Sequence, residues 1–289
     1  MNESDLVYLN GELVERRRAA ISPFDRGLLY GDGFFETTRI VRGTPLLLGR
    51  HLERLRRSCR ETGFGDSPAP DALQDGLRYL IEANRVAEGY LRITLSRGRY
   101  KGALTELECR RPTVLAEARS MELCDVGAPP PITLAPSEWR RDEQSPLMRH
   151  KSLSYQANVL ALAAGRRAGA DEVYFLNTRG ELTEGAISNL FFVRDAVVCT
   201  PAIDCGLLPG ITREVTLQLC EEARIPAQTG RFAEDELLLA EEAFCTNSLR
   251  GLMAVQGIIG HPECKIGAGP LTERLQGLYE RFVERECSR

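Results

Sequence analysis

The chain has 289 residues, a formal net charge of −4, and 43% hydrophobic and 27% charged residues. This balance is typical of a globular protein with one large or two smaller domains, and it excludes a disordered, collagen-like or disulfide-scaffold chain. The slightly acidic charge also argues against nucleic acid as a partner, because no strongly basic surface can displace the counterions of phosphate.

The N-terminal residues contain no apolar stretch after a basic region, and no run approaches the roughly 18 apolar residues of a membrane span. We therefore expect neither a secretion signal nor a membrane partner. The nine cysteines are scattered and contain no C-x-x-C pair, and the three histidines lie far apart. These features predict reduced thiols in a cytoplasmic protein and no metal site.

The predicted elements begin with a hairpin at 6–15, because Asn10-Gly11 is a strong signal for a type I′ turn. Apolar spacing then predicts two amphipathic helices, and alternation predicts two strands. The helices lie at 50–63 and 70–86, and the strands lie at 90–98 and 111–118.

Three consecutive prolines at 129–131 interrupt this pattern. Proline continues neither a helix nor a central strand, so we place an interdomain linker at 121–131. The linker would separate a small domain, 1–120, from a larger one, 132–289. A long surface loop within one domain is the alternative.

Helices and short strands are mixed in the second part of the chain. The predicted helices are 154–168, 208–223, 234–240 and a C-terminal amphipathic helix, and the predicted strands are 172–176, 189–194, 196–200 and 242–248. Together with the hairpin, this order predicts an α/β fold of α+β layers, not a single doubly wound parallel sheet.

Lysine is rare in this chain: Lys101, Lys151 and Lys265 are the only three among 37 basic residues. Arginine stays protonated and is a poor nucleophile, so a reactive amine has three candidates. Lys151 lies just before a predicted helix, whose positive end would lower the pKa of the amine. A solvated lysine at a helix entry is the alternative.

Other motifs supply parts of a site. One predicted helix begins at Gly210, Ile211 and Thr212. The free N–H groups and the hydroxyl at this helix start would suit a phosphate, and a plain N-cap is the alternative. Glu184, in LTEGAISNLFFV, could hold a protonated ring nitrogen or be an ordinary turn residue. The glycines of DRGLLYGDGFFETTRI predict tight turns beside a ligand, or else bulges in an antiparallel sheet. A reactive lysine, a phosphate site and an acid for a ring nitrogen are the parts of a pyridoxal phosphate (PLP) site.

These motifs resemble those of the fold-type IV PLP enzymes, which include branched-chain and D-amino-acid aminotransferases and 4-amino-4-deoxychorismate lyase. The resemblance runs from about Leu6 to Tyr279 through YLNGELV, DRGLLYGDGFFETTR, RHLERL, HKSLSYQANVLA, LTEGAISNLFFV, LLPGITRE and CTNSLRGLMAV. It implies a small and a large domain with the cofactor between them, and a homodimer.

The resemblance also implies residue roles. Lys151 matches the lysine that bonds to the cofactor and moves the proton, and Glu184 matches the carboxylate on the pyridine nitrogen. The other implied cofactor ligands are Arg50, Tyr155, Ile211, Thr212, Thr246 and Asn247. Tyr30, Arg39, Tyr90 and Arg92 fall at substrate-side positions.

The implied reaction is less specific than the implied cofactor. Thr37 lies where the lyases place a catalytic threonine and branched-chain enzymes usually have glycine, and LRITLSRG and CTNSLRG also resemble the lyase versions. We therefore predict a lyase that acts on an amino substrate and releases pyruvate and 4-aminobenzoate. Glu36 and the Tyr90/Arg92 pair resemble branched-chain enzymes, which keeps an aminotransferase for branched-chain or D-amino acids as the alternative. A non-catalytic binding protein on the same scaffold is a third possibility, against which the presence of Lys151 argues.

Overall fold

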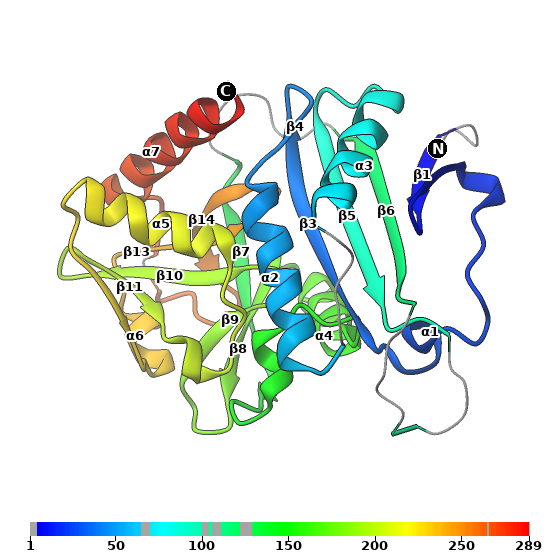
Figure 1. Cartoon of the computed structure of the whole chain (residues 1–289). Coiled ribbons are helices and arrows are strands. Elements are labelled where there is room, and N and C mark those ends of the chain that lie inside the picture. The colour runs from blue at the N-terminus through cyan, green and yellow to red at the C-terminus, as the bar shows by residue number, and fades with distance from the viewer. Residues whose placement is uncertain are drawn as a thin grey trace. The chain divides into compact units, whose positions relative to one another are not determined.

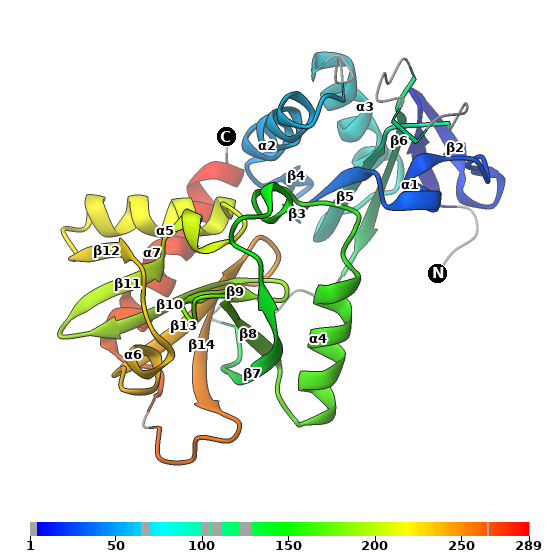
Figure 2. The same cartoon turned by 90° about the horizontal axis from the view of Figure 1, so that it is seen from below.

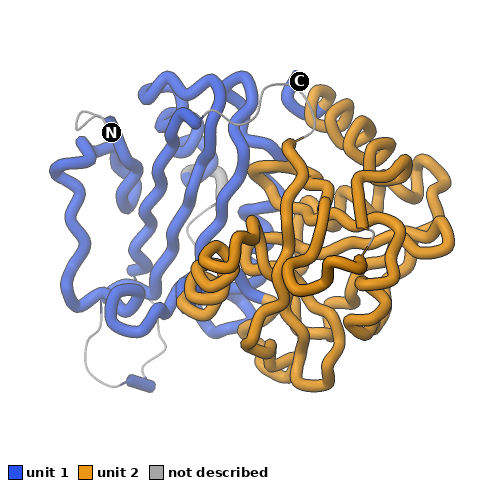
Figure 3. Tube along the Cα trace, turned by 180° about the vertical axis from the view of Figure 1, so that it is seen from behind, with its two compact units in different colours: residues 1–123, 150–155, 286–289 blue, residues 124–149, 156–285 orange. Residues whose placement is uncertain are grey.

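A computed structural model describes residues 5–64, 70–99, 104–105, 111–121, 129–264 and 266–288. The chain forms two compact units, coloured separately in Figure 3. Unit 1 contains residues 1–123, 150–155 and 286–289, and unit 2 contains residues 124–149 and 156–285. The units are thus not two continuous stretches of chain, unlike the predicted domains 1–120 and 132–289. Residues 122–128 of the predicted linker lie outside the described residues.

Unit 1 is built on a six-stranded antiparallel sheet in the order β2-β1-β6-β5-β3-β4. The strands are β1 (Leu6–Leu9), β2 (Glu12–Glu15), β3 (Gly33–Val41), β4 (Thr44–Pro45), β5 (Gly89–Ser96) and β6 (Thr113–Ser120). The helices are η1 (Arg16–Arg18), α1 (Arg26–Tyr30), α2 (Leu48–Glu61) and α3 (Pro70–Ala83). In Figure 1, α2 and α3 lie along the sheet. Their apolar stripes, including Leu55 and Leu77, form one core with Ile40, Leu91 and Ile93.

The predicted hairpin is confirmed, because Asn10 and Gly11 both have positive φ values, 53° and 103°, as a type I′ turn requires. Strand β3 was not predicted as an element. Its glycine-rich start resembles a series of turns, and Gly31 does end α1 with a φ of 66°. Residues 33–40 nevertheless pair with β5, and the buried glutamate on the core face, Glu36, hides the alternation in the sequence.

Unit 2 is built on an eight-stranded sheet in the order β12-β11-β10-β13-β14-β7-β8-β9, and β9 also pairs with β10. The strands are β7 (Ile132–Arg141), β8 (Glu172–Asn177), β9 (Leu182–Gly185), β10 (Asn189–Arg194), β11 (Val197–Pro201), β12 (Ala227–Gly230), β13 (Glu242–Asn247) and β14 (Gly251–Ile258). The β9–β10 pairing closes β10, β13, β14, β7, β8 and β9 into a ring. The closing pair is Glu184 and Asn189.

The helices of unit 2 are η2 (Pro146–Arg149), α4 (Gln156–Arg167), η3 (Ile203–Cys205), α5 (Ile211–Glu222), α6 (Glu234–Leu238) and α7 (Pro270–Cys287), whose last residues belong to unit 1. Figure 2 shows α4 beside β7 and β8, where Ala161 packs on Ala135, Val173 and Phe175. The predicted α/β fold class is confirmed, although β7 and β14 were not predicted. Among the described residues no helix has the length and apolarity needed to cross a membrane, and no acidic, histidine and cysteine side chains cluster as metal ligands.

Candidate active site

The segment 150–155 of unit 1 runs beside the start of β3 and carries Lys151. The N–H of Phe35 donates to the carbonyl oxygen of Lys151 at 2.9 Å, and the N–H of Leu153 donates to that of Gly33 at 2.9 Å. Gly33 has to be glycine, because a Cβ there would lie 2.3 Å from the carbonyl oxygen of Leu95. Pairing with β3 therefore fixes the backbone of Lys151 in unit 1. Lys101 and Lys265 lie outside the described residues.

Two aromatic rings surround the amine of Lys151. Its Nζ lies 4.5 Å from the centre of the Phe35 ring and 5.5 Å from that of Tyr155. The two rings meet edge to face, with their centres 5.2 Å apart. This contact places the predicted cofactor residue Tyr155 next to the predicted catalytic amine.

The face of the sheet that carries Phe35 also carries the predicted substrate residues of β3 and β5. Side chains alternate along a strand, so Thr37 and Arg39 share the face of Phe35, whereas Glu36 faces α2. Thr37 pairs directly with Arg92, and Arg39 pairs with Tyr90. The Arg92 guanidinium also stacks on Phe35, with its carbon 4.2 Å from the ring centre. The structure thus brings Thr37, Arg39, Tyr90 and Arg92 together on the Lys151 side of the sheet.

The charge on this face is mainly positive. Glu117, opposite Arg92, forms ion pairs with Arg16 at 3.2 Å and Arg119 at 2.7 Å. Burial and the negative charge of Glu117 raise the pKa of Tyr90. In the described part of the chain neither Arg39 nor Arg92 forms an ion pair with a carboxylate, and Nε of Arg39 is buried without a hydrogen-bond partner. Two arginines on this face of the sheet are therefore available to carboxylates of a substrate, and one of them, Arg92, shares the Phe35 ring with Lys151.

The opposite face of β3 holds a buried ionic cluster. Arg54 of α2 donates to both carboxylate oxygens of Glu36, at 2.8 and 2.6 Å, and His51 Nδ1 lies 2.7 Å from Glu36 Oε2. Burial opposes ionisation of Glu36, but the charge and hydrogen bonds of Arg54, assisted by His51, lower its pKa to about 2. Burial lowers the pKa of His51. The sequence analysis missed this cluster, for which the i, i+3 spacing of His51 and Arg54 was the available signal.

The predicted phosphate ligand Arg50 lies on an exposed part of α2. Arg54, one turn later on the same helix, is buried. The bidentate contact with Glu36 holds the guanidinium of Arg54 on the face of β3 opposite Phe35. The assignment of Arg50 to the phosphate stays a prediction.

In unit 2, Glu184 lies on the ring-closing strand β9 and is held from several sides. Its Oε2 accepts the N–H of Leu208 at 3.0 Å and the amide of Asn189 at 3.3 Å. Nη2 of Arg141 lies 3.5 Å from Oε1. The Arg141 guanidinium is buried and stacks on Phe175 at 4.0 Å. These contacts keep a buried carboxylate in one orientation beside a fixed cation.

Glu184, Asn189 and Thr246 form a row across three neighbouring strands, because Asn189 pairs with Glu184 on one side and with Thr246 on the other. Paired residues share a face of the sheet. Two strand spacings of about 4.8 Å each separate the ends of the row. A ligand with a basic ring nitrogen and a phosphate at opposite ends matches this span.

The phosphate of such a ligand would need hydrogen-bond donors at the Thr246 end of the row. The hydroxyl of Thr246 is buried, and no hydrogen-bond partner reaches it from the residues that the structure describes. Helix α5 begins after Gly210, which provides no side-chain cap, so the N–H groups of Ile211 and Thr212 lie at an uncapped helix N-terminus. A Cβ on Gly210 would lie 1.9 Å from Oδ1 of Asn189. A hydroxyl, free N–H groups and a helix dipole together form a site that fits the phosphate of PLP.

Two residues that were predicted to bind the cofactor or the substrate, Asn247 and Tyr30, make contacts within the protein. Asn247 uses its side-chain oxygen to accept the N–H groups of Leu249 and Arg250, at 3.1 and 2.8 Å, and so stabilises the turn between β13 and β14. Tyr30 ends α1 half exposed, with the Arg26 guanidinium 5.3 Å from its ring centre.

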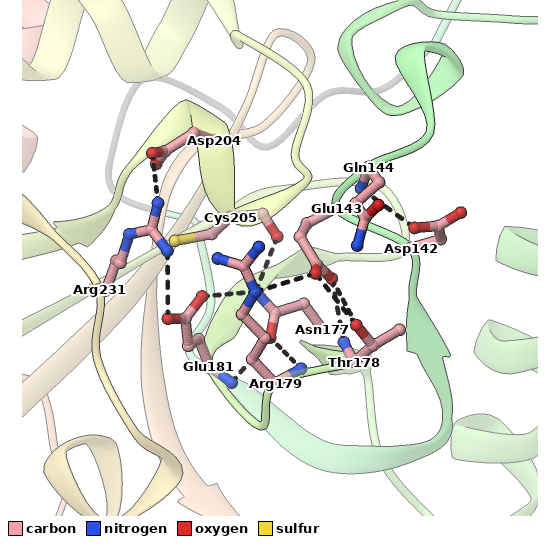
Figure 4. Close-up of polar contacts among 10 residues, drawn as sticks. All are labelled: Asp142, Glu143, Gln144, Asn177, Thr178, Arg179, Glu181, Asp204, Cys205 and Arg231. Carbon is pink, nitrogen blue, oxygen red and sulfur yellow. Dashed lines mark hydrogen bonds and ion pairs between the residues drawn. The ribbon is translucent and has the colours of Figure 1, made fainter.

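The turn that leads into β9 is anchored by the polar cluster in Figure 4. Asn177 is fully buried; its side chain accepts the N–H groups of Arg179 and Glu181 and donates to Glu181 and to the carbonyl oxygen of Cys205. Glu143 accepts from the hydroxyl of Thr178 at 2.8 Å and pairs with Arg179 at 3.2 Å. The start of the strand that bears Glu184 is consequently rigid.

Comparisons with known proteins show the family of this chain. Residues 33–258 match the family model of the class IV aminotransferases, described as "Amino-transferase class IV". The chain belongs to the class IV aminotransferase family. It is 32% identical to the aminodeoxychorismate lyase of Bacillus subtilis over 96% of this chain and 95% of that protein. It is 30% identical to the D-alanine aminotransferase of Bacillus licheniformis over 98% and 99% of the two chains.

A solved class IV structure shows the same fold with a cofactor. The branched-chain amino acid aminotransferase of T.th., with pyridoxamine 5′-phosphate, superposes with a TM-score of 0.88 at 26% identity, over 99% of this chain and 96% of that one. Class IV members are PLP-dependent, and the unpartnered Thr246 hydroxyl and uncapped helix α5 fit that cofactor. This chain is a PLP-dependent enzyme of the class IV family, as the resemblance predicted.

Proposed function

We propose that this enzyme is a 4-amino-4-deoxychorismate lyase, which releases pyruvate and 4-aminobenzoate. The observation that carries the proposal is the position of Thr37 beside Arg92, on the face of the sheet where Lys151 contacts Phe35. The hydroxyl of Thr38, the next residue, is buried and donates to the carbonyl oxygen of Leu46. In the described residues no such bond occupies the hydroxyl of Thr37, which leaves it for a substrate.

The substrate of this reaction carries two carboxylates, one on its ring and one on its enolpyruvyl group. Arg39 and Arg92 have no carboxylate partner within the described ranges and lie on the same face of the sheet. A charged donor that meets no protein acid is well suited to a carboxylate of a ligand. Two such arginines support a dicarboxylic substrate better than one with a hydrocarbon side chain.

Bound PLP supplies an electron sink that makes the α-proton of an amino substrate acidic. The Lys151 amine accepts that proton and delivers it to the departing enolpyruvyl group as the bond from the ring carbon to the enolpyruvyl oxygen breaks, with the Phe35 and Tyr155 rings limiting the hydration of the amine. Arg39 and Arg92 bind the carboxylates, and Tyr90 borders the substrate position. The Thr37 hydroxyl orients the departing enolpyruvyl group, which leaves as pyruvate while the ring becomes aromatic.

The cofactor would be held at both ends by the residues of unit 2. Glu184 keeps the ring nitrogen protonated, and Ile211, Thr212 and Thr246 bind the phosphate, with Asn247 shaping the adjacent turn. Tyr155 would contact the phenolic oxygen. Arg50 of α2 would supply the arginine on the phosphate, because its side chain is exposed and Arg54 is engaged by Glu36.

An aminotransferase for branched-chain or D-amino acids is the second candidate. The adjacency of Arg39 and Tyr90 favours it, because a tyrosine and an arginine on neighbouring strands can bind the single carboxylate of an α-amino acid. The two reactions differ in the fate of the cofactor: a lyase regenerates it in every turnover, whereas a transaminase converts it to the amine form.

Incubation of the holoenzyme with aminodeoxychorismate tests the proposal, with 4-aminobenzoate followed by fluorescence. We expect steady release of 4-aminobenzoate without a 2-oxo acid. Thr37→Val should lower kcat by a factor of roughly 100 or more with little change in KM, as expected when a group acting in the transition state is lost, and Thr37→Ser should restore most of it. Absence of 4-aminobenzoate, together with rapid conversion of the cofactor by leucine or D-alanine, would reject the lyase.

We also propose a cytoplasmic homodimer. Residues 24–30 expose Phe24, Leu28 and Leu29, and the exposed fraction of Leu28 is 70%. The described cysteines are all free thiols, and most of them are buried, as expected for a reducing compartment. Sedimentation analysis should give twice the chain mass, and a monomer at micromolar concentration would contradict the dimer.

A further inference from the structure

A continuous buried polar network in unit 2 connects Glu184 to a second carboxylate, Glu172, on the neighbouring strand β8. Glu172 is 3% exposed and accepts four bonds. Its Oε1 accepts the N–H groups of Val173 and Ala186, at 2.9 and 3.1 Å, and its Oε2 accepts the N–H of Ile187 and the hydroxyl of Ser188, at 3.2 and 2.8 Å. The carboxyl group of Glu172 therefore organises the turn that joins β9 to β10.

This turn separates Glu184 from Asn189, which face each other across its base. The N–H of Gly185 donates to the carbonyl oxygen of Ser188 at 2.7 Å. A Cβ on Gly185 would lie 2.4 Å from the Ser188 hydroxyl and 3.0 Å from the carboxyl carbon of Glu172. The turn is packed tightly enough that a shift at Glu172 must move its base.

Asn158 of α4 provides a second connection, on the side where Figure 2 shows α4 beside β7 and β8. Its Nδ2 donates to the carbonyl oxygen of Ala186 at 2.7 Å, and its Oδ1 accepts from Nη1 of Arg141 at 3.2 Å. Nη2 of the same guanidinium faces Glu184 at 3.5 Å. Asn158 thus links the turn to the cation that lies beside Glu184.

We propose that Glu172 and Asn158 are positioning residues that set the orientation of Glu184, one through the 186–188 turn and the other through Arg141. The inference rests on the proposed role of Glu184 at the cofactor ring nitrogen. Neither residue touches the reacting atoms in this scheme. Burial raises the pKa of Glu172, and its four hydrogen-bond donors oppose that shift.

Two substitutions break the network at different places. Glu172→Gln replaces a carboxylate, whose two oxygens only accept hydrogen bonds, with an amide. The NH2 group of that amide would face N–H or O–H donors of the turn and could not accept from them. Asn158→Leu removes both links of α4 to the turn and to Arg141. The matched control is Glu242→Gln: Glu242 is similarly buried and accepts the N–H groups of Leu271 and Thr272, at 3.1 and 2.7 Å, but within the described residues it makes no hydrogen bond to this network.

The test is made on full-length protein reconstituted with PLP labelled with ¹⁵N in the ring, and it measures the dissociation constant for PLP and the ¹⁵N shift of the ring as a function of pH. We expect Glu172→Gln and Asn158→Leu to weaken PLP binding by about tenfold and to move the ring titration by about half a pH unit, in the direction produced by Glu184→Gln. Glu242→Gln should leave both values at those of the wild type.

Wild-type values in both network variants, with a clear change in Glu184→Gln, would overturn the inference and leave the proposed function intact. Equal changes in Glu242→Gln and Glu172→Gln would also overturn it, because they would reflect general destabilisation. An unchanged ring signal in Glu184→Gln would reject the Glu184 assignment itself, and this inference with it.

Discussion

A substitution that removes the hydroxyl of Thr246 gives the most direct test of the proposed phosphate site. Thr246 is 1% exposed, and no hydrogen-bond partner reaches its Oγ1 in the described structure. Burial of an unpaired hydroxyl costs roughly 1–3 kcal/mol. Thr246→Val keeps the shape of the side chain and removes that cost, so the cofactor-free enzyme should become more stable by about 1 kcal/mol. With PLP bound, the same change removes a hydrogen bond to a charged phosphate, worth about 1.5–3 kcal/mol, or roughly 10- to 150-fold in the dissociation constant.

The assay compares urea unfolding of the apoenzyme with PLP titration of the same preparation. Thr272→Val is the matched control, since Thr272 Oγ1 is likewise buried without a partner but lies in α7. It should also stabilise the apoenzyme, with an unchanged affinity for PLP. Loss of apoenzyme stability in Thr246→Val would show that the hydroxyl has a structural partner, and unchanged PLP affinity would place the phosphate elsewhere. Either result refutes the reasoning.

Two further predictions concern the buried cluster of unit 1 and the start of α5. Folding lowers the pKa of Glu36 from 4.5 to about 2, so its contribution to stability is complete above pH 4.5 and is lost as the pH falls toward 2. The loss of stability amounts to about 3 kcal/mol. Between pH 5 and 2.5 the midpoint of urea unfolding should therefore fall less steeply for Glu36→Gln than for the wild type. Equal slopes in the two proteins would contradict the assignment. Gly210→Ala should displace Asn189 and weaken PLP binding at least about tenfold. Gly257→Ala is the control, because a Cβ there meets nothing within 4 Å, and this variant should bind PLP with wild-type affinity.

Local signals in the sequence were sufficient for the elements whose pattern depends on near neighbours. The Asn10-Gly11 turn and helices α2 and α3 follow from turn chemistry and from one apolar stripe per helix. Strand β14 was missed because most of its surface is buried, so the alternation that marks a half-exposed strand is absent. In β3 the burial does alternate from Glu36 onward, but the buried face carries that glutamate, which hides the alternation in the sequence.

The candidate site, too, could be predicted from the sequence only in part. The scarcity of lysine and the motif around Lys151 singled out the amine without any structure. Arg141 and Glu172 gave no comparable signal, and Arg54 gave only its i, i+3 spacing with His51. Each matters because of a buried partner distant in sequence: Glu36 is 18 residues from Arg54, and Ser188 is 16 residues from Glu172. Spacing along the chain carries no information on such pairs.

The sequence alone determined the family and the cofactor, and it singled out Lys151 as the predicted reactive amine, because these depend on residue types in short motifs. Only the tertiary structure decided which side chains act together. Pairing with β3 places Lys151 in unit 1, the alternation of β3 puts Thr37 on the side of the amine and Glu36 on the other, and closure of the strand ring puts Glu184 in one row with Thr246. Such neighbours are set by hydrogen bonds between strands far apart in the chain, and those exist only once the sheets have formed.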